Sequence, residues 1–304
     1  MMSNKIVVLG SLNVDTILQV DHFPSPGETL SLKNKQTAGG GKGANQAIAA
    51  ARSKAETSFI GKIGQDENGQ FMLKQLVDSG VSTDFVSQAL DTGTGQAFVM
   101  LEKSGENRIL IYGGANAELN EKDIEKAMSK INEADFLVAQ LETPVETTLK
   151  AFELAKKAGA LTILNPAPAI KNLSVELLKL TDIITPNETE AEILTGIPVI
   201  DNDSMARAAQ KLHDLGIKIV IITLGERGVY FDTENDSGIV PAYKVNAVDT
   251  TAAGDTFLGA FSSEIHPALD NLVDAIRYGN KASSLAVQKM GAQPSIPARD
   301  EIIR

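Results

Sequence analysis

The sequence predicts an α/β fold in which helices cover both faces of a mostly parallel sheet. Three observations predict it: short apolar runs recur along the chain, segments with helical periodicity separate them, and glycine or proline marks several of their ends. Strands of a parallel sheet are buried on both faces, so they read as continuous apolar runs. We expect residues 1–304 to form a single α/β domain, long enough for a sizeable core.

The main elements follow in chain order from this alternation. Residues 6–9 form an apolar run that Gly10 ends, and residues 43–52 form a helix rich in small residues. The later predicted strands are residues 136–140, 161–164, 182–185, 218–223 and 229–231. The later predicted helices are residues 144–157, which Pro144 begins and Gly159 ends, 204–215 and 270–288. In the last two, apolar residues recur at helical spacing, so each helix has one apolar face.

Two regions break this alternation. Residues 13–20 and 28–36 have strand character and are separated by a proline-rich turn. Residues 95–101 and 108–112 are β-rich, and residues 103–107 between them are typical of a hairpin turn. Two hairpins in an α/β chain predict a small separate sheet, formed by about residues 13–36 and 93–113. Such a sheet can act as a lid over the main domain or as a dimerisation surface, and the two roles are compatible.

Composition excludes several classes of function. The net charge is −11, from 39 acidic and 28 basic residues, and no Lys/Arg cluster interrupts the acidic balance, so we expect no nucleic-acid partner. No stretch approaches the roughly 20 apolar residues of a membrane span, and the first apolar run is too short for a signal peptide. The absence of cysteine excludes disulfides and cysteine nucleophiles. We expect a cytoplasmic protein without a membrane partner.

Residues 38–47, Ala-Gly-Gly-Gly-Lys-Gly-Ala-Asn-Gln-Ala, form a glycine-rich segment. A P-loop is excluded because no Ser or Thr follows Lys42 and no glycine has the required upstream spacing. What remains is a glycine-rich turn that opens a helix, where backbone N–H groups approach a ligand and Asn45 projects from the first turn. The alternative is a tight turn into a helix packed closely on the sheet. Residues 61–69 contain a similar turn, which we interpret as structural, with Asp66 capping the next helix.

Two further segments directly follow predicted strands, where α/β sheets place their ligands. Asn187 and Glu190 share a helical face and can hold water around a phosphate-bound metal, although Asn187 is also a good N-cap. In residues 223–228, Thr-Leu-Gly-Glu-Arg-Gly, the glycines can let backbone amides contact a nucleotide phosphate. The alternative for this segment is a turn into the next strand.

The most informative segment is residues 252–257, Ala-Ala-Gly-Asp-Thr-Phe, which opens a helix. Small residues with free N–H groups at a helix N-terminus form an anion-binding site. Asp255 stands where it can accept a proton from a hydroxyl group while this site holds a transferring phosphoryl group. The alternative is that Asp255 only caps the helix. The sequence contains neither a Gly-x-Ser-x-Gly nor a His-Glu-x-x-His motif, so serine hydrolases and zinc proteases have no support.

These segments, in this order, resemble the ribokinase family of carbohydrate kinases, also called the phosphofructokinase-B type. Residues 39–47 resemble the first signature of the family, residues 249–257 the second, and residues 291–295 a further family segment. The resemblance covers essentially the whole chain. It implies a doubly wound, ribokinase-like α/β kinase domain with a β-sheet lid that pairs two subunits. It also implies transfer of the γ-phosphoryl group of ATP to the 5-hydroxyl of D-ribose, with Mg²⁺.

The resemblance also implies roles for individual residues. Asp255 is the base, and the amides of Ala252, Ala253 and Gly254 form the anion hole. The sugar hydroxyls are bound by Asn13, Asp15, Gly41, Lys42, Asn45 and Glu142. The nucleotide site is lined by Asn187, Thr223, Leu224, Gly225, Glu226, Arg227, Gly228 and Asn280, the last standing where the family often has a histidine. Glu190 organises Mg²⁺ through water, and K⁺ is bound by Asp249, Thr251, Ala286, Lys289, Gly291 and Ser295.

Other functions remain open on the sequence alone. A kinase for deoxyribose or another small sugar would keep the same catalytic turn, because one hydroxyl contact can separate such substrates. A sugar-binding regulator would keep the fold without the chemistry, although the pair Gly254 and Asp255 argues against it. A nicotinamide oxidoreductase is disfavoured because residues 10–15 lack the Gly-x-Gly-x-x-Gly spacing.

Overall fold

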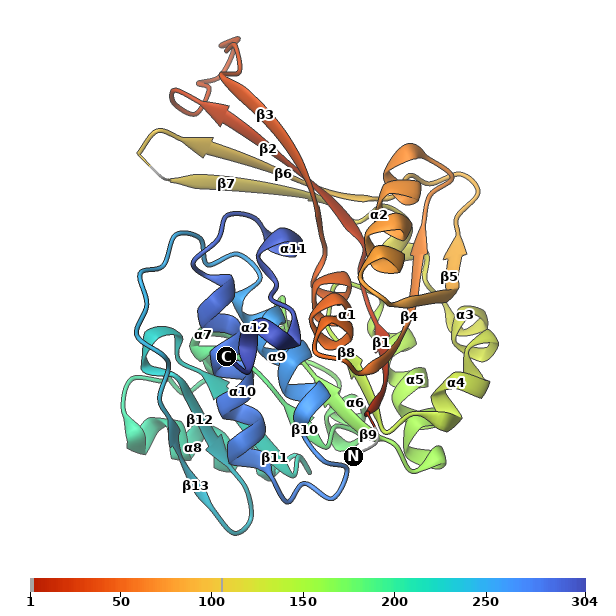
Figure 1. Cartoon of the computed structure of the whole chain (residues 1–304), viewed down its shortest axis with the longest axis vertical. Helices are drawn as coiled ribbons and strands as arrows, with labels where there is room; N and C mark the ends of the chain where they lie inside the picture. Colours follow the sequence, from red (N-terminus) through yellow and green to blue (C-terminus); the bar gives the residue numbers. More distant parts are fainter. Residues whose placement is uncertain (1–2, 105) are drawn as a thin grey trace.

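A nine-stranded mixed sheet is flanked by helices, and a separate four-stranded sheet extends from it (Figure 1). The structure is a computed structural model that describes residues 3–104 and 106–304. In spatial order the large sheet consists of β13 (Ser237–Val240), β12 (Val229–Asp232), β11 (Ile219–Thr223), β10 (Ile183–Ile184), β9 (Leu161–Leu164), β8 (Phe136–Ala139), β1 (Lys5–Leu9), β4 (Glu56–Ile63) and β5 (Ser82–Gln88). Only β12 and β13 run antiparallel to their neighbours within this described sheet. The prediction of a mostly parallel sheet is confirmed.

The order of the strands makes the sheet doubly wound. From β1 the chain moves outward through β4 and β5, then crosses to β8 and continues through β9, β10 and β11 on the other side. The strand order therefore reverses between β1 and β8. Ligands of such sheets bind outside the carboxyl ends of the strands at this reversal, which in this chain means beside Gly10 and Gln140.

Helices cover both faces of the large sheet, as predicted. The helices are α1 (Lys42–Arg52), α2 (Glu67–Asp78), η1 (Gly114–Glu118), α3 (Glu121–Lys126), α4 (Met128–Glu133), α5 (Val145–Ala158), α6 (Val175–Lys179), α7 (Glu188–Thr195), α8 (Asn202–His213), η2 (Gly225–Arg227), α9 (Ala253–Glu264), α10 (Leu272–Ala286), α11 (Ala292–Ser295) and α12 (Arg299–Ile302). Alternate residues of β1 face opposite layers: Ile6 and Val8 pack with α1 and α9, whereas Val7 and Leu9 pack with α5. This alternation produces two buried cores, one on each face of the sheet.

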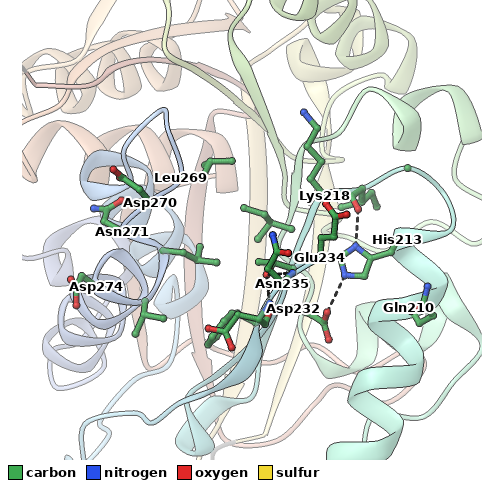
Figure 2. Close-up of a pocket in the computed structure, with 18 residues that line it drawn as sticks. Gln210, His213, Lys218, Asp232, Glu234, Asn235, Leu269, Asp270, Asn271 and Asp274 are labelled. Atoms are coloured by element: carbon green, nitrogen blue, oxygen red, sulfur yellow. Dashed lines mark hydrogen bonds and ion pairs between the residues drawn. The ribbon is translucent and has the colours of Figure 1, made fainter.

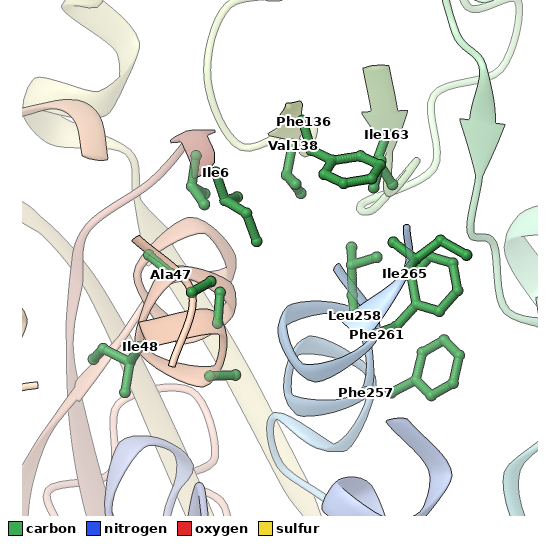
Figure 3. Packing of buried hydrophobic residues seen from close by; sticks show 14 of the residues in the cluster. Ile6, Ala47, Ile48, Phe136, Val138, Ile163, Phe257, Leu258, Phe261 and Ile265 are labelled. Carbon is green, nitrogen blue, oxygen red and sulfur yellow. The ribbon is translucent and has the colours of Figure 1, made fainter. Parts of the chain in front are cut away.

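Helices α1 and α9 pack side by side on one face of the sheet. Figure 3 shows Ala47 on α1 and Leu258 and Phe261 on α9, near the strand residue Val138. The helices approach so closely that a Cβ atom at Gly259 would lie 2.3 Å from the backbone oxygen of Gln46. Backbone contact at this point fixes the start of α9 relative to the start of α1, and both starts carry candidate site residues.

The four-stranded sheet has the order β3 (Asn34–Gly40), β2 (Asn13–Val20), β6 (Gly95–Glu102) and β7 (Asn107–Tyr112). It consists of two antiparallel hairpins joined by a parallel pair, β2 with β6. The edge strand β7 exposes its apolar side chains: Ile109, Leu110 and Ile111 are 54–65% accessible. Gly105, in the predicted hairpin turn, lies outside the described residues.

The structure corrects some strand predictions. Residues 28–33 are not a strand, because Glu28 folds back and accepts a hydrogen bond from the Ser25 N–H at 2.9 Å; β3 instead runs to Gly40. Strands β4 and β5 were not predicted, since β5 is a half-exposed edge strand and β4 mixes polar with apolar residues. The four main predicted helices match α1, α5, α8 and α10 to within two residues at each end. In residues 3–104 and 106–304, no helix has the length and apolar character that crossing a membrane requires.

Candidate active site

A cavity of about 210 Å³ opens at the carboxyl ends of the parallel strands, beside the reversal in strand order. Its walls come from the ends of β9, β10 and β11 and from the starts of α1, α7 and α9. It is lined by Lys42, Asn165, Ala167, Thr185, Asn187, Glu190, Thr223, Thr250, Ala252, Ala253, Gly254, Asp255 and Phe257. The fold thus brings residues from four separate candidate segments together in one cavity.

A larger hollow, of about 900 Å³, lies at the opposite edge of the sheet (Figure 2). Figure 2 shows His213 and Asp232 on one side of it and Leu269 and Asp270 on the other. His213 Nε2 lies within hydrogen-bonding distance of Asp232 Oδ1, at 3.2 Å, and His213 Nδ1 lies 2.8 Å from the Ile217 carbonyl oxygen. No predicted site residue is among the described residues that line this hollow. We place the candidate site in the smaller cavity, because chemistry-bearing side chains and a helix N-terminus converge there.

Asp255 is the third residue of α9 and is held by two side-chain amides. Its Oδ2 accepts a hydrogen bond from Asn45 Nδ2 at 3.0 Å, and its Oδ1 accepts one from Gln46 Nε2 at 2.9 Å. The helix cap is Ala252, which makes no side-chain capping bond. The alternative interpretation, that Asp255 only caps the helix, is therefore wrong. The carboxylate is 8% accessible and lines the cavity, where it can meet a substrate.

The N-terminus of α9 presents backbone amides to the same cavity. Ala252 adopts a left-handed conformation, with φ 58°, which turns the chain sharply into the helix. The Ala253 N–H donates to the Thr250 carbonyl at 3.2 Å. In the described part of the chain, the amides of Ala252, Gly254 and Asp255 have no hydrogen-bond acceptor. Free N–H groups at the positive end of a helix dipole form an anion-binding site.

The residues predicted to bind a sugar surround the start of α1. Glu142 Oε2 accepts from the Lys42 N–H at 3.0 Å and also from the Ser11 hydroxyl. Gly41 has φ 88°, and a Cβ atom there would lie 2.8 Å from the Asn13 nitrogen, so this turn requires glycine. Asp15 lies against Gly40, where an added Cβ atom would be 2.2 Å from its Oδ2.

The carboxylates in this part of the site influence one another. Burial, with smaller contributions from the charges of Glu142 and Asp255, raises the pKa of Asp15 to about 7. Burial alone would lower the pKa of Lys42. The negative charges of Asp255, Glu142 and Glu190 outweigh burial and raise the pKa of the Lys42 ammonium above its ordinary value. Lys42 is therefore a permanent cation beside the cavity.

The raised pKa of Asp15 predicts a pH dependence of stability. The pKa is about 7 in the folded protein against 3.8 for the unperturbed group, so the folded state binds the proton more tightly. This contribution to stability is fully present below about pH 4 and is lost as the pH rises through about 7. Relative to Asp15→Asn, the wild-type free energy of unfolding is expected to fall over this range and to level off above it. Urea denaturation of both proteins from pH 4 to pH 8 measures the difference, and parallel curves would contradict the assignment.

Asn187 and Glu190 form a capping box at the start of α7 while lining the cavity. Asn187 Oδ1 accepts from the Glu190 N–H and Glu190 Oε2 accepts from the Asn187 N–H, both at 2.8 Å. Burial raises the pKa of Glu190, although the Asn187 N–H and the charge of Lys42 oppose it. Asn187 and Thr223 are joined by a parallel β-bridge. The capping interpretation is thus correct, and it is compatible with a ligand contact from the same residues.

The rest of the predicted nucleotide segment surrounds η2, and only Thr223 of residues 223–228 lines the cavity. The side chain of Leu224 is buried in the core, so only its backbone can face a ligand. Gly225 and Gly228 have positive φ angles, which the predicted glycine turn requires. Asn280 lies outside the cavity lining, and its Nδ2 donates to the carbonyls of Val240 and Pro241 at 3.2 Å each. That side chain supports the 240–241 backbone.

The predicted cation-binding residues lie in two segments, residues 249–251 and 286–295. A hydrogen bond between Asp249 and Gly291 joins these segments. Asp249 Oδ1 accepts from the Thr251 N–H at 2.9 Å, and Asp249 Oδ2 accepts from the Gly291 N–H at 2.9 Å. Burial opposes ionisation of Asp249, but these hydrogen bonds prevail and hold its pKa below the ordinary value. The Ala286 carbonyl accepts from Lys289 N–H at 3.0 Å, and the Ser295 hydroxyl donates to a neighbouring carbonyl at 2.7 Å.

The donor sets fit the two implied cations. Glu190 and Asp255 give the cavity two carboxylates, and Mg²⁺ on a phosphate substrate uses one or two carboxylates with water. At the joined segments, Asp249 supplies a carboxylate and the neighbouring backbone supplies carbonyl oxygens, the ligands that hard cations prefer. The described residues contain no group of three or more His, Cys, Asp and Glu side chains positioned for a metal. Any cation at these places therefore depends on carbonyls, water or substrate for further ligands.

Sequence reasoning missed several buried polar residues of the site. They are Ser11, Gln46, Asn116 and Gln140, together with the partly buried Asn165. Asn116 donates to Asn13 Oδ1 at 2.8 Å and so leaves the Asn13 amide hydrogens free for a ligand. A signal was available for Ser11, Gln140 and Asn165, because each follows a parallel strand at the edge where ligands bind. For Asn116 the sequence offers none, since it reaches Asn13 from 103 residues away.

A buried carboxylate, a helix N-terminus with free amides and a polar cavity are together typical of a phosphotransferase acting on a hydroxylated small molecule. The sequence matches the family described as pfkB family carbohydrate kinase over residues 3–299. The chain therefore belongs to the pfkB family of carbohydrate kinases.

Similar individual proteins agree with this assignment. The chain is 53% identical to a protein named ribokinase from Staphylococcus aureus over 99% of both chains. It is 46% identical to a ribokinase from Haemophilus influenzae, over 99% of this chain and 98% of that one. The solved structure of Arabidopsis thaliana ribokinase complexed with ribose and ATP is similar with a TM-score of 0.92 and 35% identity, covering 99% of this chain and 98% of that one.

Proposed function

We propose that this protein is an ATP-dependent ribokinase, which transfers the γ-phosphoryl group of ATP to the 5-hydroxyl of D-ribose and releases ADP. One observation carries the proposal: Asn45, a predicted sugar ligand, donates to the carboxylate of Asp255 at 3.0 Å, at the helix N-terminus that binds phosphate. Sugar and phosphate would therefore meet at one carboxylate. The ribose and ATP bound to the Arabidopsis relative support the same choice of substrates.

The chemistry follows from the arrangement of these residues. Asp255 accepts the proton of the 5-hydroxyl as its oxygen attacks the γ-phosphorus, and the bond from that phosphorus to the β–γ bridging oxygen breaks, so that ADP leaves. The free amides of α9 stabilise the charge on the transferring group. The cation Lys42, which also lines the cavity, adds positive charge there. Asp15 and Glu142 accept hydrogen bonds from sugar hydroxyls, and Asn13 and Asn45 donate to them.

The proposal also covers the cations, the nucleotide contacts and the location of the protein in the cell. Bound Mg²⁺ would neutralise the charge of the ATP phosphates, and Glu190 would hold the Mg²⁺ ion through water. K⁺ would occupy the oxygen-rich segments around Asp249. Residues 187, 223–228 and 280 would form the nucleotide side. We propose a cytoplasmic protein, since ATP is its co-substrate and it contains no cysteine.

We further propose one kinase domain with the four-stranded sheet as its lid, and a homodimer paired through that sheet. The exposed apolar side chains of β7, Ile109, Leu110 and Ile111, support this pairing, because contiguous exposed apolar surface marks interaction sites. The net charge of −11 supports the absence of a nucleic-acid partner.

The proposed function is tested by steady-state release of ADP with ATP and Mg²⁺ over a panel of ribose, deoxyribose, hexoses and nucleosides. Each sugar is assayed in K⁺ and in Na⁺. Ribose is expected to give the highest kcat/KM, and K⁺ to raise the activity. A clear preference for deoxyribose or a hexose would contradict the ribose assignment alone. No turnover with any member of the panel would contradict the kinase function and favour a sugar-binding regulator.

A further inference from the structure

Gln46 connects the carboxylate of Asp255 to the interior of the protein. The side chain is 1% accessible and lies on α1, one position after Asn45. Its Nε2 donates to Asp255 Oδ1 at 2.9 Å and to Asn165 Oδ1 at 3.2 Å. Both amide hydrogens of Gln46 are therefore in use, and one of them is directed at the base.

Gln140 determines which way the amide of Gln46 points. Gln140 is fully buried at the end of β8, and its Nε2 donates to Gln46 Oε1 at 2.5 Å. With its oxygen held by this donor, Gln46 has to present its NH₂ group to Asp255. A reversed amide would place oxygen against Asp255 and against Asn165, where both neighbours offer acceptors.

The two ends of the network are Gln140 and Asn165. Gln140 Oε1 is buried and has no hydrogen-bond partner among the described residues. At the other end Asn165 is fixed as well, because its Nδ2 donates to the Thr185 carbonyl at 2.9 Å.

We propose that Gln46 and Gln140 are positioning residues for the base Asp255, an inference that rests on the proposed kinase function. The χ2 torsion of an aspartate is broad, so its carboxylate plane needs external partners to define it. Gln46 holds one oxygen and Asn45 the other, which fixes that plane relative to the incoming hydroxyl. Gln140 hydrogen-bonds to Gln46 and not to Asp255, so it acts through Gln46.

The test uses the near-isosteric variants Gln46→Met and Gln140→Met, which keep side-chain volume and remove the donors. Misplacement of a catalytic group by about 1 Å can cost on the order of 10²-fold in rate, so kcat of Gln46→Met is expected to fall by about 10- to 100-fold. KM for ribose and for ATP is expected to stay close to wild type. Gln140→Met is expected to lower kcat by a smaller factor, with the same constancy of KM.

A double variant and a control distinguish positioning from packing. Because Gln140 acts through Gln46, the double variant is expected to have the kcat of Gln46→Met alone. Thr148→Val, on α5, removes another fully buried polar group, one that belongs neither to the cavity lining nor to this network, and is expected to leave kcat unchanged. Circular dichroism confirms that each variant is folded at the assay temperature.

Each outcome of these experiments either supports or overturns the positioning role of Gln46 and Gln140. A fall in kcat with constant KM and no additivity supports the inference. Wild-type kcat in a folded Gln46→Met or Gln140→Met protein, or effects that multiply in the double variant, would overturn it while leaving the proposed function intact. Absence of turnover in the wild-type protein would overturn the proposed function and this inference together.

Discussion

Asp255→Asn is expected to lower kcat by about 10²- to 10⁴-fold, the usual contribution of a general base, while ribose still binds. Asparagine keeps the shape of the side chain but cannot accept the proton of the hydroxyl. It also places an NH₂ group where either Asn45 or Gln46 already donates, at 3.0 and 2.9 Å. The sugar contacts from Asp15 and Glu142 are unchanged, so calorimetric titration with ribose should give an affinity near that of wild type.

Asp274→Asn is a suitable control for this variant. Asp274 lies at the larger hollow on the opposite edge of the sheet, and its side chain is 74% accessible. Its replacement is expected to leave kcat and ribose affinity unchanged. A turnover near wild type in Asp255→Asn would remove Asp255 from the mechanism. Loss of ribose binding together with turnover would instead assign Asp255 to sugar binding.

The second large effect is expected at Gly259, where α9 contacts α1. An alanine Cβ there would lie 2.3 Å from the Gln46 carbonyl oxygen and 2.5 Å from Ala49 Cβ, so the two helices must separate. Such overpacking typically destabilises a core by about 1–3 kcal/mol. Because separation also moves Asn45 and Gln46 away from Asp255, we expect Gly259→Ala to lower both the free energy of unfolding and kcat. Urea denaturation and steady-state kinetics measure the two effects.

Gly238→Ala provides the matched control for the glycine substitution. An added Cβ at Gly238, on the edge strand β13, would lie 3.5 Å from Phe231, an ordinary contact distance. Its effect on stability is expected to be within about 0.5 kcal/mol, as for most surface changes. If Gly259→Ala proved as stable and as active as Gly238→Ala, close backbone contact between α1 and α9 would not be needed for the site.

Much of the large sheet could be predicted because local sequence carries the signal. Strands such as β8 and β11 are short apolar runs, and helix α5 begins after Pro144 and ends at Gly159. The separate sheet was predicted from two hairpin patterns, but the position of β3 was not. Its register depends on pairing with β2, from Asn13 opposite Gly40 to Gln19 opposite Asn34, and not on a local apolar run.

The site could be predicted only in part, for a related reason. Asp255 and Asn45 stand in motifs with recognisable local chemistry, and the fold brings them within 3.0 Å although 210 residues separate them. Gln140 belongs to no such motif, and its only local signal is its position directly after the parallel strand β8. Its importance lies in a hydrogen bond to Gln46, 94 residues away, and only the packing of β8 against α1 creates it. Networks behind a catalytic group depend on such long-range contacts.

The central claim is that Asp255 directs phosphoryl transfer to the 5-hydroxyl of ribose, and the structure of the product tests it most directly. Proton-coupled ³¹P NMR of the product from ATP and ribose is expected to show a phosphomonoester triplet, because the phosphate is coupled to the two hydrogens on C5. A doublet, from phosphate on a carbon with one hydrogen, would contradict the assignment of the acceptor hydroxyl. Inorganic phosphate as the only new signal besides those of ADP would contradict transfer to sugar altogether.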